Sequence, residues 1–246
     1  MFSSNAGLPI EPLAQRYRDC EGEALLRPLI EREFPGRIAV LSSFGAESAL
    51  LLAMVARIDP STPVIFLDTG QLFAETLQYR DALLELLGLS DLRVIGPDPQ
   101  EIALHDPDGM LWHRDADACC RLRKVRPAER AMAPFSATIS GRKRYQGGAR
   151  AALAAIEAAE NRILVNPLAP FSRERIEEEF AARGLPPHPL EAQGFLSIGC
   201  APCTDRVGPH EDRRAGRWRG SDKLECGIHD RGHRAAEARS DGHGPA

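Results

Sequence analysis

Two pairs of cysteines carry most of the chemical information in this sequence. Cys119 and Cys120 are adjacent, whereas Cys200 and Cys203 are separated by an Ala-Pro dipeptide. Adjacent cysteines form a disulfide only with strain, so the first pair needs another role. Four thiolates can hold either one zinc ion or a 4Fe–4S cluster. Because a cluster offers four separate irons, the pattern favours it over a single zinc ion, on which adjacent sulfurs would have to converge.

A fifth cysteine, Cys226, lies in the segment 225–229, which reads Glu-Cys-Gly-Ile-His. The surrounding chain is polar, so Cys226 is not expected to fill a core. Positive charge from His229 and from upstream arginines can lower the pKa of this thiol, and the thiolate is the nucleophilic form. We therefore predict that Cys226 is a catalytic nucleophile, with an incidental surface cysteine as the alternative. The sixth cysteine, Cys20, lies in no motif.

Residues 42–48, Ser-Ser-Phe-Gly-Ala-Glu-Ser, lie between an expected strand and an expected helix. Their small side chains let backbone N–H groups approach an anion, which the helix dipole also attracts. The loop lacks the lysine of a Walker sequence. It is a candidate phosphate-binding loop, although a simple strand-to-helix turn would use the same residues.

The elements that must position these residues alternate between strands and helices. Apolar runs indicate buried strands at 38–44, 63–70, 92–95 and 137–141, and helices are expected at 46–57 and 74–87. This alternation predicts an α/β fold, with a parallel twisted sheet covered by helices on both faces. Ligands of such folds bind at the carboxyl ends of the strands, where the sequence places residues 42–45, 68–70 and 140–142.

The later part of the chain has a different character. An alanine-rich helix is expected over 149–161 and an amphipathic helix over 173–183. From residue 204 the chain has few core-forming residues, and 231–246 are polar enough to indicate disorder. We therefore expect an α/β domain at 1–203 that binds nucleotide and cluster, and a mobile C-terminal segment at 204–246 that carries Cys226.

Composition limits the class of protein. The chain has 246 residues, 43% of them hydrophobic, and a net charge of −4, which argues against a general nucleic-acid binder. Basic residues nevertheless cluster at 121–124, 142–144 and 213–217, which suggests a small anionic ligand. No secretory signature or membrane-length apolar run is present, so we expect a cytoplasmic protein without a membrane role, whose cysteines stay reduced.

Taken together, these motifs resemble the assimilatory sulfonucleotide reductases, the family of adenylyl-sulfate and phosphoadenylyl-sulfate reductases. Their fold is the adenine-nucleotide alpha hydrolase-like, or PP-loop, fold. The resemblance covers roughly residues 36–230. The segments that carry it are, in chain order, 43–48, 67–70, 119–124, 141–150, 199–204, 214–218 and 225–229.

The resemblance implies a role for individual residues. Cys226 would be catalytic, and a 4Fe–4S cluster would be held by Cys119, Cys120, Cys200 and Cys203. The substrate site would contain Ser42, Ser43, Phe44, Gly45, Ser48, Leu67, Asp68, Thr69, Gly70, Lys124, Arg144, Arg150, Arg214, Arg217 and His229. The loop residues would form a modified PP-loop, the segment 67–70 would lie near adenosine, and the cations would surround the phosphosulfate. Because the turn at 146–148 departs from the usual family sequence, both Arg144 and Arg150 are retained.

The implied reaction is reduction of adenylyl sulfate to sulfite and AMP in sulfate assimilation. Cys226 would form an S-sulfonate, which thioredoxin or glutaredoxin would resolve. Within this family, the four cysteines accompany adenylyl sulfate rather than its 3′-phosphorylated form. The sequence leaves open whether the chain forms a homo-oligomer.

Three alternatives remain at this point. The chain could be a phosphoadenylyl-sulfate reductase. It could be a PP-loop ATP-dependent adenylating enzyme, such as a tRNA thiolase or a sulfate adenylyltransferase subunit, which would not need the segment 225–229. It could also be a zinc-stabilised nucleic-acid-binding module, which the net charge of −4 disfavours.

Overall fold

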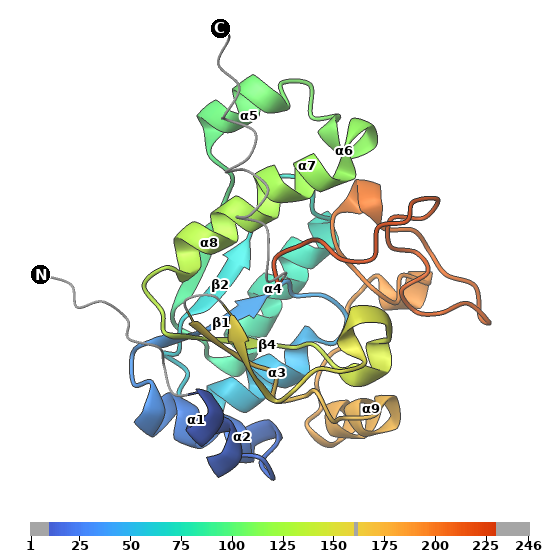
Figure 1. Cartoon of the computed structure of the whole chain (residues 1–246). Helices are drawn as coiled ribbons and strands as arrows, with labels where there is room; N and C mark the ends of the chain where they lie inside the picture. Colours follow the sequence, from blue (N-terminus) through green and yellow to red (C-terminus); the bar gives the residue numbers. More distant parts are fainter. Residues whose placement is uncertain (1–9, 160–161, 230–246) are drawn as a thin grey trace, which may run out of the picture.

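The computed structural model describes residues 10–159 and 162–229, and within them a six-stranded sheet forms the centre of the molecule (Figure 1). The strands are β1 Ile38–Ser42, β2 Val64–Leu67, β3 Leu92–Ile95, β4 Ala137–Ser140, β5 Ile156–Ala159 and β6 Arg162–Val165. Their order is β3-β2-β1-β4-β6-β5, and neighbouring strands are parallel except for β5 and β6. The predicted α/β fold with a mainly parallel sheet is therefore confirmed.

Helices surround this sheet. They are α1 Ile10–Arg16, α2 Gly22–Pro28, α3 Ser48–Ala56, α4 Ala74–Leu87, α5 Pro99–His105, α6 Leu111–Arg114, α7 Ala116–Cys120, α8 Arg126–Met132 and α9 Arg173–Ala182. Turns of π-helix occur at Leu29–Glu33 and Arg121–Val125, and 3-10 turns at Arg144–Gln146, Gly148–Arg150, Glu191–Gln193 and Ala201–Cys203. In the part of the chain that is described, no helix has the length and apolarity needed to span a membrane.

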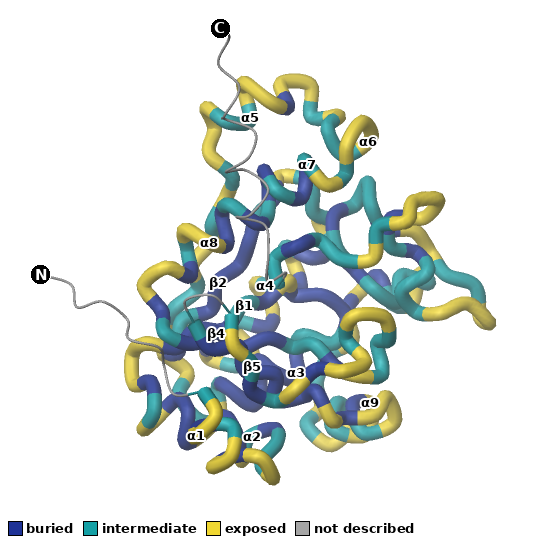
Figure 2. Tube along the Cα trace, viewed as in Figure 1, coloured by how far each residue is buried: buried dark blue, intermediate teal, exposed yellow. Residues whose placement is uncertain are grey.

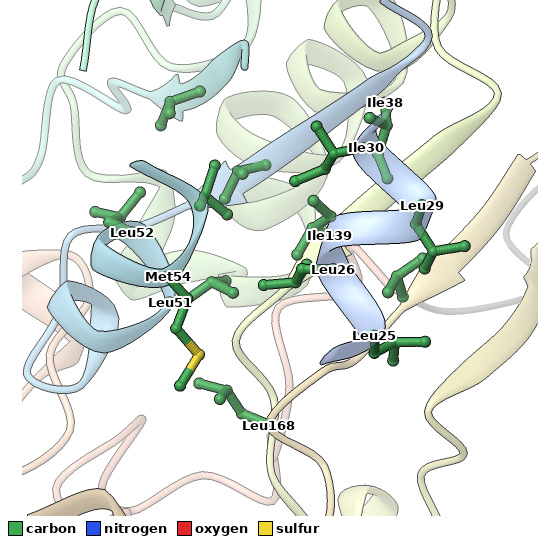
Figure 3. Packing of buried hydrophobic residues seen from close by; sticks show 14 of the residues in the cluster. Leu25, Leu26, Leu29, Ile30, Ile38, Leu51, Leu52, Met54, Ile139 and Leu168 are labelled. Carbon is green, nitrogen blue, oxygen red and sulfur yellow. The ribbon is translucent and has the colours of Figure 1, made fainter. Parts of the chain in front are cut away.

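Hydrophobic cores lie on both faces of the sheet, because successive strand residues point to opposite faces. On one face, Ile38 and Ile139 pack with leucines of α2 and α3, such as Leu26 and Leu52 (Figure 3). On the other face, Ile65 of β2 belongs to a smaller core with residues of α8. Figure 2 shows the result: the strands are mostly buried, and exposure is concentrated on the outer surfaces of the helices.

The prediction of a helix over 149–161 is wrong for residues 149–159, and residues 160–161 lie outside the described part of the chain. This segment contains the 3-10 turn Gly148–Arg150 and strand β5, which pairs antiparallel with β6. The helix propensity of alanine exceeds that of other ordinary residues by less than about 1 kcal/mol, so strand pairing can outweigh it. By contrast, α3, α4 and α9 lie where helices were expected, whereas α1, α2 and the four helices α5 to α8 were not foreseen.

The described part of the C-terminal segment, residues 204–229, contains no helix or strand. A single bridge joins Thr204 to Arg217, and Trp218 is buried. The segment lies over the end of the sheet at which β1, β2 and β4 finish, where several of its residues line a cavity. Residues 231–246, which were predicted to be disordered, lie outside the described residues.

Candidate active site

A cavity of about 470 Å³ opens at the carboxyl ends of the strands, and its volume suits a nucleotide-sized ligand. It lies where a parallel α/β sheet is expected to bind ligands. Its walls come from the loops after β1, β2 and β4 and from the C-terminal segment. Of the residues predicted from sequence, the cavity is lined by Ser42, Ser43, Gly45, Ser48, Leu67, Thr69, Lys124, Arg150, Arg214, Arg217, Cys226 and His229.

Three predicted substrate residues support the loops from outside the cavity. Phe44 is fully buried, and its ring packs edge-on against Phe66 with 5.4 Å between ring centroids. Its φ of 48° is a backbone conformation that few residues with side chains adopt, so the core holds a strained loop in place. The side chain of Asp68 accepts a hydrogen bond of 3.0 Å from the backbone N–H of Gly70, which shapes the turn after β2.

Arg144 also lies outside the cavity. Its side chain is exposed, and its Nε donates a hydrogen bond of 2.8 Å to the carbonyl oxygen of Leu153. Arg150, in the following 3-10 turn, does line the cavity. The structure therefore assigns the cavity position to Arg150, of the two arginines that the sequence left open.

A carboxylate in the loop between β1 and α3, Glu47, organises the neighbouring loop after β4. It accepts hydrogen bonds from Lys143 Nζ at 2.7 Å, from Gln146 Nε2 at 3.1 Å and from the Tyr145 hydroxyl. Burial would raise the pKa of Glu47, but the Lys143 ammonium and these hydrogen bonds outweigh burial and lower it. Sequence reasoning missed Glu47, and its signal was an acidic residue in a loop expected to bind anions.

Two guanidinium groups of the cavity share one carboxylate, that of Glu225. Arg150 binds it with Nε and Nη2, at 2.6 Å and 2.8 Å, and Arg214 Nη2 lies 3.1 Å from Glu225 Oε1. Burial would raise the pKa of Glu225, but these arginines lower it overall. Glu225 is therefore an ionised group inside the cavity. From the sequence, Glu225 had no predicted role beyond its place in the motif.

Two other cations of the cavity, Lys124 and Arg217, form no ion pair with a carboxylate in the described part of the chain. Arg217 Nε is buried and has no hydrogen-bond partner there. A buried donor without a partner costs free energy, which a ligand acceptor could recover. These two side chains therefore leave positive charge available to an anion in the cavity.

Lys124 lies beside both the cavity and the cysteines. It belongs to the π-helical turn Arg121–Val125, which joins α7 to α8. Such turns are frequent at functional sites. Burial would lower the pKa of Lys124, but the nearby thiols of Cys200 and Cys226 outweigh burial and raise it. The Lys124 ammonium therefore stays charged, and it lies between the four motif cysteines on one side and Cys226 on the other.

Cys226 is half-buried and lines the cavity near Lys124 and Arg214. His229 lines the same cavity, where burial, followed by the charges of Arg142 and Arg150, lowers its pKa to about 3. At neutral pH His229 is therefore uncharged. An uncharged His229 does not supply the positive charge that was expected from the sequence, and the cations that line the cavity with Cys226 are a lysine and several arginines.

The four motif cysteines line a second, smaller cavity, which also contacts Lys124. Cys119 and Cys120 end α7, and Cys200 Sγ lies 3.2 Å from Thr69 Oγ1. Burial, with additional repulsion from neighbouring thiols, raises the pKa of Cys119 to about 12. Burial also raises the pKa of Cys120, to about 11. The two pairs, 80 residues apart in the chain, are thus brought together around one small space.

This donor set fits a metal cluster. In the described residues, no group of three or more His, Cys, Asp or Glu side chains is placed to hold a metal ion, although four thiols surround one small space. Thiols around a space, rather than around one point, suit a cluster in which each sulfur binds its own iron. Burial raises the pKa of Cys119, Cys120 and Cys203, so a multivalent cation would have to displace the protons of these thiols. Cys119, Cys120, Cys200 and Cys203 are thus the residues that could hold such a cluster.

Comparison with known proteins agrees with the geometry. A model of the phosphoadenosine phosphosulfate reductase domain matches residues 37–206. The chain is 51% identical to the adenosine 5′-phosphosulfate reductase of Mesorhizobium japonicum, with 83% of each chain covered. It is 48% identical to the adenosine 5′-phosphosulfate reductase of a Chelativorans species, with 88% of this chain and 89% of the relative covered.

A further relative, from Gloeobacter violaceus, is called phosphoadenosine 5′-phosphosulfate reductase and is 38% identical, with 89% of this chain and 93% of that one covered. Among solved structures, the phosphoadenylyl-sulfate reductase of Candida auris superposes with a TM-score of 0.67 at 23% identity, covering 84% of this chain and 98% of that one. At that identity the superposition shows the fold alone. The family match spans more than half of the sequence, and the chain therefore belongs to the phosphoadenosine phosphosulfate reductase domain family.

Proposed function

We propose that this chain is an adenylyl-sulfate reductase, which reduces adenylyl sulfate to sulfite and AMP in sulfate assimilation. The observation that carries the proposal is a thiol, Cys226, in a nucleotide-sized cavity that also holds Lys124 and Arg217, two cations that pair with no carboxylate among the described residues. The adenosine 5′-phosphosulfate reductases at 51% and 48% identity support the same reaction. Its chemistry needs a nucleophile for sulfur and cations for a phosphosulfate, and the cavity offers both.

Binding would rest on the loop after β1 and on the cations. Backbone N–H groups of residues 42–48 and the first turn of α3 can receive the phosphate. Lys124 and Arg217 would face the charge that develops on the leaving phosphate and on the sulfonate oxygens. Such preorganised charges typically contribute about 3 kcal/mol each to stabilising a transition state in a water-poor site.

The reaction proceeds in two stages. The Cys226 thiolate attacks sulfur, an S–S bond forms, the S–O bond to the phosphate breaks, and AMP leaves with the electron pair. The product is an enzyme Cys–S–SO₃⁻. A thiolate of thioredoxin or glutaredoxin then attacks Cys226 Sγ and releases sulfite, which carries away the bonding pair. A second thiol of the reductant resolves the mixed disulfide and regenerates Cys226, so two thiols supply both electrons.

The cluster would be held by Cys119, Cys120, Cys200 and Cys203, and would supply a fixed charge distribution beside the substrate. Lys124, which contacts both cavities, would link that charge to the phosphosulfate. His229, uncharged because burial lowers its pKa to about 3, can exchange hydrogen bonds with the substrate but adds no charge.

Adenylyl sulfate is the proposed substrate rather than its 3′-phosphorylated form. Support comes from the four cysteines and from the names of the relatives at 51% and 48% identity, whereas the relative named for the phosphorylated form is 38% identical. The test is kcat/KM for both nucleotides with the same reductant. A clear preference for the 3′-phosphorylated nucleotide would reverse the choice of substrate and leave the reaction type intact.

The test of the reaction is intact-mass spectrometry after mixing the protein with adenylyl sulfate and no reductant. The wild type and the control C20S should gain the mass of one SO₃ group, whereas C226S should gain none. Sulfonation of C226S would sink the assignment of the nucleophile. Release of pyrophosphate from ATP by the wild type would instead support a PP-loop adenylating enzyme.

A further inference from the structure

The carboxylate of Glu225 occupies the place that an anionic ligand would take between Arg150 and Arg214. Its two oxygens meet Arg150 Nε and Nη2 in a bidentate arrangement, at 2.6 Å and 2.8 Å. Arginine binds phosphate and sulfate oxygens in this same way. One oxygen also accepts from Arg214 Nη2 at 3.1 Å. Glu225 therefore makes the contacts that the substrate anhydride would need.

The guanidinium of Arg150 is fully engaged in this arrangement. Two of its nitrogens bind Glu225, and the third, Nη1, donates a hydrogen bond of 2.6 Å to Gln146 Oε1. Arg214 Nη2 also donates to the carbonyl oxygen of Leu224 at 2.9 Å. An anion entering the cavity can bind Arg150 bidentately only if Glu225 leaves it.

Glu225 is also the residue before Cys226. Its side chain is 25% exposed and anchors this stretch to the cavity wall, together with Ile228, which packs against the core around Ile65, and Lys223, which pairs with Asp117. The ion pairs with Arg150 and Arg214 are the anchor nearest to the thiol. Breaking them frees the backbone directly before Cys226.

We propose that Glu225 is a positioning residue that acts as an internal anion: it holds Cys226 against the arginines in the free enzyme and is exchanged for the phosphosulfate on binding. This inference rests on the proposed function, since it takes the ligand to be a nucleoside phosphosulfate. The exchange couples arrival of substrate to movement of the thiol. It also lowers the apparent affinity, because part of the binding energy displaces Glu225.

The exchange can be measured with ADP, whose β-phosphate stands where adenylyl sulfate carries its sulfate. Wild type, E225Q and E225A are compared by isothermal titration calorimetry with ADP and with AMP. Removing the carboxylate should tighten ADP binding roughly tenfold, the factor expected if Glu225 holds the arginines about nine-tenths of the time. AMP, which lacks the second anionic group, should change less.

The matched control is D91N. Asp91 also forms a bidentate pair with an arginine, since Arg93 Nε and Nη2 donate to its two oxygens at 3.0 Å and 2.8 Å, and it does not line the cavity. Its loss should leave ADP affinity unchanged. A second measurement follows alkylation of Cys226 by iodoacetamide without ligand, with Cys20 in the same sample as the internal reference. E225Q and E225A should both alkylate faster at Cys226, and D91N should not.

The outcomes separate the two proposals. If the wild type makes sulfite and both Glu225 variants bind ADP no tighter than the wild type, Glu225 is a structural anchor and the inference is overturned. If no variant binds ADP and the wild type makes no sulfite, the proposed function fails and the inference fails with it. Tighter ADP binding with faster alkylation, in both variants, supports the exchange.

Discussion

The guanidinium of Arg217 lies over the indole ring of Trp218, with 4.5 Å between Arg217 Cζ and the ring centroid. On another side it contacts the backbone of Gly199, where an added Cβ would come within 2.3 Å of Arg217 Nη2. The indole ring of Trp218 and the backbone of Gly199 therefore hold the Arg217 guanidinium in place. Because no carboxylate in the described part of the chain neutralises it, its charge stays available to the cavity.

Replacing either available cation should reduce catalysis more than stability. For R217M and K124M we expect kcat/KM with adenylyl sulfate to fall about 10²- to 10³-fold, the usual cost of removing one preorganised transition-state contact. Steady-state kinetics measure it. R219M is the control, because Arg219 pairs with Glu211 at the surface and should leave kcat/KM within about twofold. Equal losses in R217M and R219M would contradict the assignment.

Gly199 should affect catalysis only by leaving room for the guanidinium of Arg217. In G199A the new methyl group would displace the guanidinium, since no real Cβ approaches another atom within 2.3 Å. We expect kcat/KM to fall about as far as in R217M, and the double variant to be no worse than either single variant. A double-mutant cycle on kcat/KM checks this, and additive losses would show that Gly199 has a separate role.

Removing one motif cysteine should remove iron. Anaerobically purified wild type and C20S are expected to contain iron and acid-labile sulfide and to absorb visible light. C120S should lose most of both, because three thiolates and a buried hydroxyl hold a cluster poorly. Zinc in place of iron, without sulfide, would contradict the cluster and favour a single-metal site.

A buried histidine should make stability depend on pH. His188 accepts a hydrogen bond of 3.2 Å from the Leu190 N–H on Nδ1, and its Nε2 lies 3.2 Å from Thr76 Oγ1. Burial lowers its pKa to about 4, from 6.5. As pH falls through 6.5 the unfolded state takes up the proton first, so stability is complete above 6.5 and is lost between 6.5 and 4.

The expected loss is about 1.4 kcal/mol per pH unit at most within that window. Urea unfolding at pH 7.5 and at pH 5 measures it. H188Q should be less stable than wild type at pH 7.5, but should lose less on acidification. An identical pH dependence in both proteins would show that His188 does not titrate on unfolding. His229, whose pKa is also lowered, is present in both and cancels from the comparison.

The elements that carry the site could be predicted because their sequences are locally consistent. Apolar runs such as Val64–Leu67 have only one stable environment, a strand covered on both faces, and Gly88 ends α4 with a φ of 66°, as its glycine suggests. Strand β5 could not be predicted in this way. Its alanines favour a helix locally, and its pairing with β6 becomes visible only in three dimensions.

The residues of the candidate site differ in the same way: some are recognisable from the local sequence, and others depend on partners that are distant in the chain. The two cysteine pairs stood out because their types and spacing are unusual in any protein, and Lys124 was implied by the resemblance to the sulfonucleotide reductases. The roles of Glu47 and Glu225 were missed, since a lone glutamate in a loop looks like a solvated surface residue. Their importance depends on Lys143, 96 residues from Glu47 in the chain, and on Arg150, 75 residues from Glu225, and only the fold brings those charges within hydrogen-bond distance.

The π-helical turn Arg121–Val125 has a consequence for how this site can change. The turn sits between the cysteine pair that ends α7 and the regular helix α8, with Lys124 inside it. A π turn holds one residue more than an α turn, and each helical residue rotates the chain by about 100°. Deleting one residue here would therefore turn Cys119 and Cys120 away from their partners or turn Lys124 away from the cavity. The number of residues in this turn therefore fixes the direction of the Lys124 side chain relative to those of Cys119 and Cys120. This stretch should tolerate substitutions far better than changes in length.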